Sequence, residues 1–231
     1  MTSYCGSPPF PKDWLLRWNF DPVLLGALAV CALLALRSNR PAPGLGGVAV
    51  LAVAFVSPLC ALSVALFSAR AVHHLLIVAV AAPLLALAFP ARRNSDLGVA
   101  LLVATATLWL WHVPTLYDRA LADTLTYWLM QLTLIGSAFW LWRALFAAPP
   151  MPATLAAVLA MAQMGMLGAL LTFAPGALYA AHAGTTLAWG IGQVADQQLA
   201  GLIMWVPGNL PYAVVTAMLG RRAWLRAAGV A

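Results

Sequence analysis

The sequence contains no glutamate, a single lysine and only three cysteines, and charged residues make up 8% of its 231 positions. Six aspartates offer little for general acid–base catalysis, and the chain has no Ser-His-Asp order, HExxH motif or glycine-rich phosphate loop. We therefore expect a protein that is not an enzyme. A water-soluble exterior needs more charge than this, so the composition also excludes a soluble domain.

The few charges and cysteines exclude two further classes of protein. The net charge of +6 is scattered over loops and forms no basic stripe, so we expect no nucleic-acid partner. Cys5, Cys31 and Cys60 form no CxxC or CxC pair, and we expect no disulfide framework. Cys31 and Cys60 lie inside apolar runs, where they are expected to be buried packing residues.

Hydrophobic residues make up 64% of the chain and are gathered in long runs. Seven runs approach the roughly 20 residues that cross a bilayer as a helix. We predict an all-α, polytopic membrane protein, a bundle of seven transmembrane helices, with the lipid bilayer around it. The predicted spans are 20–36, 45–67, 71–89, 97–113, 125–146, 154–173 and 199–219. They form one membrane domain, 20–219, between an extracytoplasmic segment, 1–19, and a cytoplasmic basic tail, 220–231.

The distribution of lysine and arginine predicts the orientation, because cytoplasmic loops carry the excess of these residues. With the N-terminus outside, eight lie on inner loops: Arg37, Arg40, Arg92, Arg93, Arg143, Arg221, Arg222 and Arg226. Four lie outside: Lys12, Arg17, Arg70 and Arg119. Lys12 and Arg17, just before the first span, favour the opposite orientation, but the total favours an outer N-terminus. The ratio of arginine to lysine suggests a bacterium, and we expect a multi-pass protein of the bacterial inner (cytoplasmic) membrane.

This threading places all four histidines on the outer side. His73 and His74 open the third span, His112 closes the fourth, and His182 lies in the loop before the last. Ionisable groups at membrane depth are functional candidates by default. The imidazoles come from separate parts of the chain, and Asp196 stands at the start of the last span. This arrangement predicts a metal site of His74, His112 and Asp196, with His73 and His182 as weaker candidates. The alternatives are interfacial hydrogen-bonding histidines and an aspartate that caps a helix.

Three further features bear on such a site. Neighbouring residues on a helix point about 100° apart, so only one of His73 and His74 can face a common centre, and we expect it to be His74. Met161 and Met164 share a helix face in the sixth span and are weaker candidate ligands, because thioethers suit Cu(I), although methionine also fills irregular cores. Pro114 and Pro207-Gly208 are expected to interrupt helices, leaving backbone carbonyls near His112 without intrahelical partners.

Four segments together resemble the CtaG-type cytochrome c oxidase assembly factors, which are seven-helix bacterial membrane proteins. The segments are Ser57-Pro58-Leu59, Phe67-Ser68-Ala69 through His74-Leu75-Leu76 to Pro83-Leu84-Leu85, Trp111-His112-x-Pro-x-x-Tyr117-x-x-Ala120-Leu121, and Asp196-Gln197-Gln198-Leu199-Ala200-Gly201-Leu202-Ile203-Met204-Trp205. The last is the most specific, and the resemblance runs from about Val53 to Tyr212.

The resemblance implies maturation of a haem–copper oxidase in the respiratory chain, with copper handled at the outer membrane face. The partners that it implies are oxidase subunits and a copper chaperone. His74, His112 and Asp196 match polar positions of the pattern. The chain departs from it at Arg70 and near Gln131, where family members often have histidine. The alternatives are a haem-binding membrane cytochrome and a metal-free scaffold that docks oxidase subunits.

Overall fold

The computed structural model describes residues 3–91 and 96–229 and is all-α, as predicted. Arg92 and Arg93 of the predicted inner loops lie outside the described residues, and the side chain of Arg226 is not described. The helices are α1 (Pro22–Leu36), α2 (Pro41–Val56), α3 (Leu59–Ala65), α4 (Phe67–Leu75), α5 (Ala82–Ala88), α6 (Leu97–Leu110), α7 (Pro114–Ala122), α8 (Thr124–Ala147), α9 (Pro150–Phe173), α10 (Gln193–Trp205) and α11 (Leu210–Ala227).

Within the described residues, four helical stretches are long and apolar enough to cross a membrane: Phe67–Ala88, Thr124–Ala147, Pro150–Phe173 and Gln193–Leu225. Two further pairs qualify if each bent pair is one span, α2 with α3 at 48° and α6 with α7 at 76°. The first apolar helix, α1, has only 15 residues. The chain is thus a multi-pass membrane protein with four to six candidate spans, and the predicted count of seven is not confirmed.

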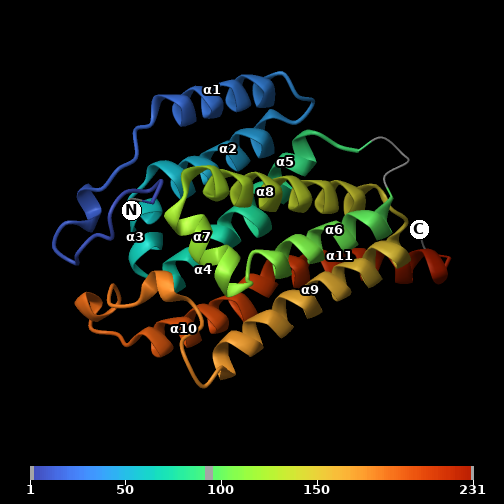
Figure 1. Ribbon diagram of the computed structural model, residues 1–231. Coiled ribbons are helices and arrows are strands. Elements are labelled where there is room, and N and C mark those ends of the chain that lie inside the picture. The colour runs from blue at the N-terminus through green and yellow to red at the C-terminus, as the bar shows by residue number, and fades with distance from the viewer. Residues whose placement is uncertain (1–2, 92–95, 230–231) are drawn as a thin grey trace.

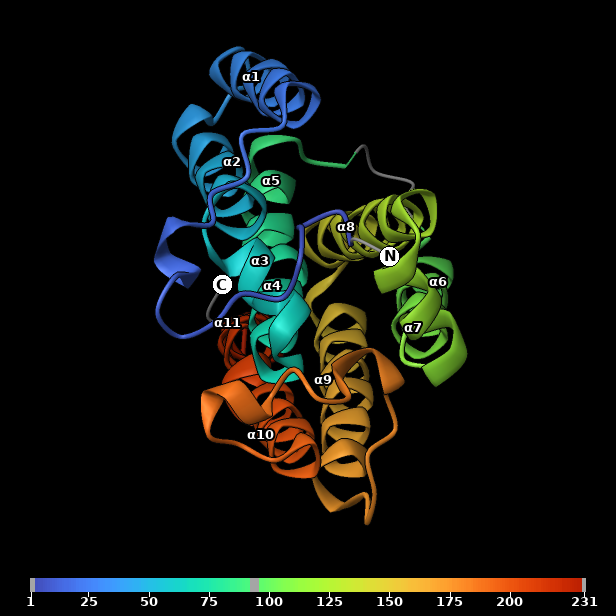
Figure 2. The same ribbon diagram turned by 60° about the vertical axis from the view of Figure 1, so that its left-hand side comes forward.

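The helices pack into an elongated bundle with α1 at its edge (Figures 1 and 2). The central helix α4 packs against α10, α8 packs against α5 and α6, and α9 lies along both α10 and α11. A side chain at Gly201 of α10 would place its Cβ 2.5 Å from the Gly168 carbonyl oxygen of α9. Only glycine permits this approach, and small residues commonly bring membrane helices so close.

The predicted break between the second and third spans is misplaced. Helix α3 ends at Ala65, Leu66 is extended, and α4 already begins at Phe67. Arg70, counted above as an outer loop cation, therefore lies inside α4 and is fully buried. No proline or glycine marks this break, so residue propensities do not locate it.

Proline positions were informative elsewhere. Pro114 is the first residue of α7, after a sharp turn from α6, and the hydroxyl of Tyr179 donates to the His112 carbonyl at 3.1 Å. Pro207 begins a short 3₁₀ turn, Pro207–Asn209, between α10 and α11. A π-helical stretch, Leu76–Ala81, precedes Pro83. There the Trp142 indole donates to the Val78 carbonyl at 2.8 Å, which satisfies a carbonyl in the irregular stretch.

Of the expectations for the cysteines, only the burial of Cys60 is confirmed. Cys5 and Cys60 form a disulfide that ties the N-terminal segment to α3, and Cys31 is exposed. The N-terminal segment folds back over the bundle, where Tyr4 stacks on Tyr127 with ring centroids 5.1 Å apart. This tertiary contact brings together two cysteines separated by 55 positions, which no local spacing motif reveals. Cys31 is exposed because α1 packs chiefly on α2 and leaves its other faces free.

Candidate functional site

Two of the predicted histidines line one buried cavity of about 20 Å³, between α4, α6, α8, α9 and α10. His74 comes from α4 and His112 from the end of α6. Two thioethers, Met164 of α9 and Met204 of α10, line the same cavity, together with Arg70. The remaining lining residues are apolar: Phe67, Ala71, Leu75, Val78, Leu108 and Leu134. The cavity therefore presents imidazole and thioether groups in an apolar surround.

The ring of His112 is held in a defined tautomer. Its Nδ1 lies 2.7 Å from the Leu108 carbonyl oxygen, which can only accept a hydrogen bond. Nδ1 therefore carries the proton, and the lone pair is on Nε2. A metal-binding histidine commonly has this arrangement, in which a backbone carbonyl orients the ring through its other nitrogen.

His74 faces the interior as predicted and is 9% exposed. Its Nε2 lies 3.4 Å from the Gln131 amide nitrogen, a long contact that is weak by the usual geometric standard. His73 is fully buried as well but packs edge-on against Phe55 of α2, with centroids 4.9 Å apart. It does not line the cavity with His74 and His112.

The carboxylate of Asp196 lies elsewhere and binds the start of α4. The backbone N–H of Phe67 donates to Oδ2 at 2.6 Å and that of Ser68 to Oδ1 at 3.2 Å, and the Ser68 hydroxyl donates to Oδ1 too. Leu66, which precedes α4, has no polar side chain for this purpose. Asp196 thus caps a helix, as the alternative interpretation held, but the helix is α4 and not its own α10, which follows Gly192.

His182 is also buried, and it is paired with Tyr117. The Tyr117 hydroxyl and the His182 Nε2 are 2.7 Å apart. Burial, with a smaller contribution from the positive charge of Arg70, lowers the pKa of His182 from 6.5 to about 3. The imidazole is therefore neutral throughout the physiological range, and it does not line the cavity with His74 and His112.

The two candidate methionines have different surroundings. Met164 is buried and lines the cavity, whereas Met161 lines a shallow groove on the outer side of α9 with Trp205 and Asn209. Met204 is the residue that sequence reasoning missed. It lies on α10 within the segment that carried the strongest family resemblance, eight positions and about two helical turns after Asp196.

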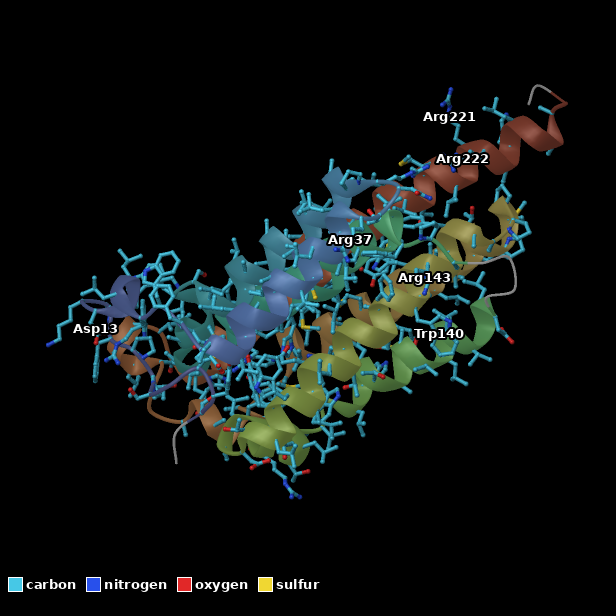
Figure 3. The ribbon with its side chains drawn as sticks, turned by 90° about the horizontal axis from the view of Figure 1, so that it is seen from above. Asp13, Arg37, Trp140, Arg143, Arg221 and Arg222 are labelled. Atoms are coloured by element: carbon cyan, nitrogen blue, oxygen red, sulfur yellow. A yellow bond between two sulfur atoms is a disulfide. The ribbon has the colours of Figure 1, made fainter. Side chains whose placement is uncertain are left out.

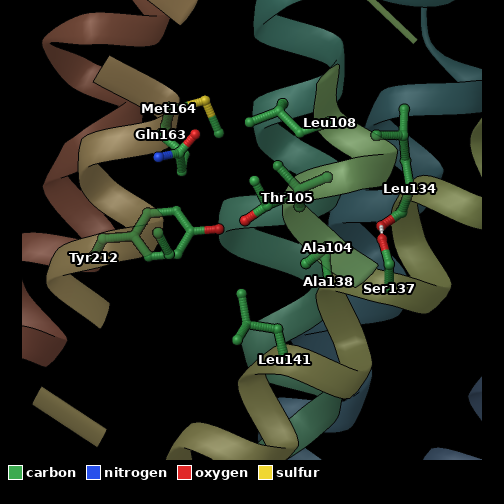
Figure 4. Close-up of a pocket in the computed structure, with 12 residues that line it drawn as sticks. Ala104, Thr105, Leu108, Leu134, Ser137, Ala138, Leu141, Gln163, Met164 and Tyr212 are labelled. Atoms are coloured by element: carbon green, nitrogen blue, oxygen red, sulfur yellow. Dashed lines mark hydrogen bonds between the residues drawn. The ribbon is translucent and has the colours of Figure 1, made fainter. Parts of the chain in front are cut away.

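A second internal cavity of about 40 Å³ adjoins the first (Figure 4). The two share Val78, Leu108, Leu134 and Met164 as lining residues. Its polar groups are all uncharged: Thr105, Ser137, Gln163 and Tyr212. Met164 therefore lines both the cavity with two histidines and the cavity with hydroxyl and amide groups.

The donor set limits the metals that the first cavity suits. In the described part of the chain, no three His, Cys, Asp or Glu side chains are close enough to hold a metal. A metal at this cavity would depend on thioether sulfur beside imidazole nitrogen. Soft, neutral ligands of this kind suit Cu(I) and do not suit Mg²⁺ or Ca²⁺, which require oxygen.

The comparison with protein families agrees with the resemblance seen in the sequence. The model of the cytochrome c oxidase caa3 assembly factor family matches residues 35–96 and 91–227, which is most of the chain. The chain belongs to this family. No curated protein matches the chain, and no solved structure does. The matched region includes every side chain that lines the histidine cavity of this caa3 assembly factor family member.

Replacing Asp196 by alanine should destabilise the protein. The substitution leaves two buried backbone N–H groups and a hydroxyl without an acceptor, at a cost of about 2 kcal/mol or more. Asp196→Asn keeps one carbonyl oxygen and should cost less. Thermal melting in detergent measures the stability of both variants. Unchanged melting of Asp196→Ala with loss of bound metal would instead make Asp196 a ligand.

The depressed pKa of His182 should make stability depend on pH. The unfolded chain takes up a proton near pH 6.5 and the folded chain only near pH 3, so stability is complete above 6.5 and falls as the pH drops towards 3. At pH 5 this loss amounts to at most about 2 kcal/mol, at about 1.4 kcal/mol per pH unit. His182→Gln should show a smaller loss of melting temperature between pH 7.5 and pH 5. An identical pH response would show that His182 contributes nothing.

Proposed function

We propose that the protein assists the assembly of a haem–copper cytochrome c oxidase by binding Cu(I) in the cavity lined by His74, His112, Met164 and Met204, in a bacterial cytoplasmic membrane. Family membership supports the assembly role. The observation that carries the copper proposal is that two imidazoles and two thioethers from four helices line one buried cavity. The role is non-catalytic: the protein receives the ion from a copper chaperone, holds it and passes it to oxidase subunits.

The cavity favours copper over haem. A volume of about 20 Å³ holds little more than one or two water-sized groups, far less than a porphyrin requires. Cu(I) needs few ligands, and His112 already presents a free Nε2. His74 has only the long Gln131 contact to give up. His73, His182, Met161 and Asp196 are left out of this proposed site, because none of them lines the cavity.

The orientation that we propose has the N-terminus outside and the C-terminus in the cytoplasm. Asp13 lies at one end of the molecule, whereas Arg37, Arg143, Arg221 and Arg222 lie towards the other (Figure 3). The burial of Arg70 removes one cation from the outer count, so the asymmetry increases. The Cys5–Cys60 disulfide supports the same orientation, because disulfides persist in oxidising compartments and are rare in the cytosol.

Thiol labelling tests the orientation. If Cys5 and Cys60 face the oxidising side, membranes dissolved in SDS should show one reactive thiol, that of Cys31, before reduction and three after it. A maleimide reagent that adds mass counts them on a gel. The Cys31→Ser variant should then show none before reduction. Three reactive thiols without reduction would contradict the proposed orientation.

Copper binding should depend on the cavity residues. His112→Ala and Met164→Leu should each weaken Cu(I) affinity by 10-fold or more and lower oxidase activity in cells, because each removes a ligand. The abundance of the protein should change little, since one such contact contributes on the order of 1 kcal/mol to helix packing. Added copper should partly restore activity by mass action.

Met166→Leu is the matched control, because Met166 lies on the same helix but is 48% exposed. This variant should keep both copper affinity and oxidase activity. Normal oxidase activity in His112→Ala would overturn the copper proposal and favour a metal-free scaffold that docks oxidase subunits. Loss of the protein itself in His112→Ala would make that residue structural.

A further inference from the structure

Arg70 is the most unusual charge in the described part of the chain. It lies inside α4, is fully buried, and none of its three guanidinium nitrogens has a hydrogen-bond partner. An arginine within a membrane bundle normally pairs with an acid or with backbone carbonyls. Removing an ion from water costs several kcal/mol unless such partners compensate. The buried guanidinium therefore requires a negatively charged partner that is not a side chain of the described residues.

The neighbours of Arg70 do not neutralise its charge. Asp196 caps the same helix, but its oxygens are taken by Phe67 and Ser68. The one ion pair among the described residues joins Arg17 to Asp13 on the surface. The face of the Tyr127 ring lies 5.5 Å from the guanidinium carbon, and a cation–π contact of this kind is too weak to offset the cost of burying the charge.

The cavity beside Arg70 limits what the partner can be. Arg70 lines the same space of about 20 Å³ as His74 and His112. A single water needs about 10–15 Å³ by this measure, so the space takes one or two water-sized groups and not a phosphate ester or a lipid headgroup. Its other walls are largely apolar and contain no carboxylate. A buried cation that no carboxylate neutralises, with its N–H donors facing a largely apolar pocket, favours an anion.

We propose that this cavity binds one small monovalent anion of halide size on the guanidinium of Arg70. This binding goes beyond the proposed copper function and does not require a metal. It also bears on that function: a Cu(I) ion held by neutral imidazoles and thioethers would place a second positive charge beside Arg70, and the anion offsets one of the two.

The test uses metal-free protein in detergent, so that its outcome is separate from that of the copper experiments. Chloride is titrated against gluconate at constant ionic strength while thermal melting is followed. Because gluconate is too large for the cavity, chloride should raise the melting temperature by several degrees and the effect should saturate. Arg70→Gln should abolish this dependence. Arg119→Gln, which removes an exposed cation from α7, should keep it.

A direct measurement covers the case in which Arg70→Gln does not fold. The chloride NMR signal should broaden in the presence of wild-type protein and of Arg119→Gln, and excess bromide should reverse the broadening by competition. Equal melting in chloride and gluconate, with no broadening, would overturn the proposal and leave a water in the cavity. Chloride dependence that persists in Arg70→Gln would overturn the assignment to Arg70.

Discussion

The carboxylate of Asp196 on α10 fixes where α4 begins, and the positions of Arg70, His73 and His74 follow from that point. A helix advances 1.5 Å and turns 100° per residue. Once Phe67 and Ser68 are bound to Asp196, Arg70 and His74, four positions apart, lie on one face of α4 and line one cavity. His73 points away from them and packs against Phe55. A single buried carboxylate thus sets the register of the helix that carries Arg70, His73 and His74.

The interior that results is polar but contains few charges. His112 is oriented by the Leu108 carbonyl, Met164 and Met204 supply sulfur, and the polar groups that line the neighbouring cavity are all uncharged. Neutral ligands suit a monovalent soft ion that must later be released, because they bind it without the strong attraction of a carboxylate or thiolate. The positive charge of Arg70 disfavours the binding of a cation alone in the same cavity. The proposed anion on Arg70 and the proposed copper on His112 are therefore complementary and not competing occupants.

The sequence predicted those features that depend on local chemistry. The apolar runs gave the helical membrane class, and Pro114 and Pro207 marked real interruptions. The 100° spacing predicted that only one of His73 and His74 lines a common site, and the expected one, His74, lines a cavity with His112. Asp196, which was expected as a ligand beside His74 and His112, caps α4 instead.

Features that depend on tertiary contacts were not predictable in this way. The break at Leu66 contains no proline or glycine. It is determined by the carboxylate of Asp196, which lies 129 positions away from Phe67 in the sequence. This error placed Arg70 in a loop, when it is buried in α4. The Cys5–Cys60 bond depends on the N-terminal segment folding over the bundle, which no cysteine spacing reveals. Met204 was hidden for a related reason: methionine is common in apolar helices, and only the packing of α10 against α4 and α9 brings it to the histidines.

X-ray absorption of the Cu(I)-loaded, detergent-purified protein tests the central claim most directly. The account predicts a low-coordinate copper whose nearest neighbours include both imidazole nitrogen and thioether sulfur, with the sulfur contribution reduced in Met204→Leu. A copper bound only by nitrogen and oxygen, or a protein that retains no copper, would contradict it.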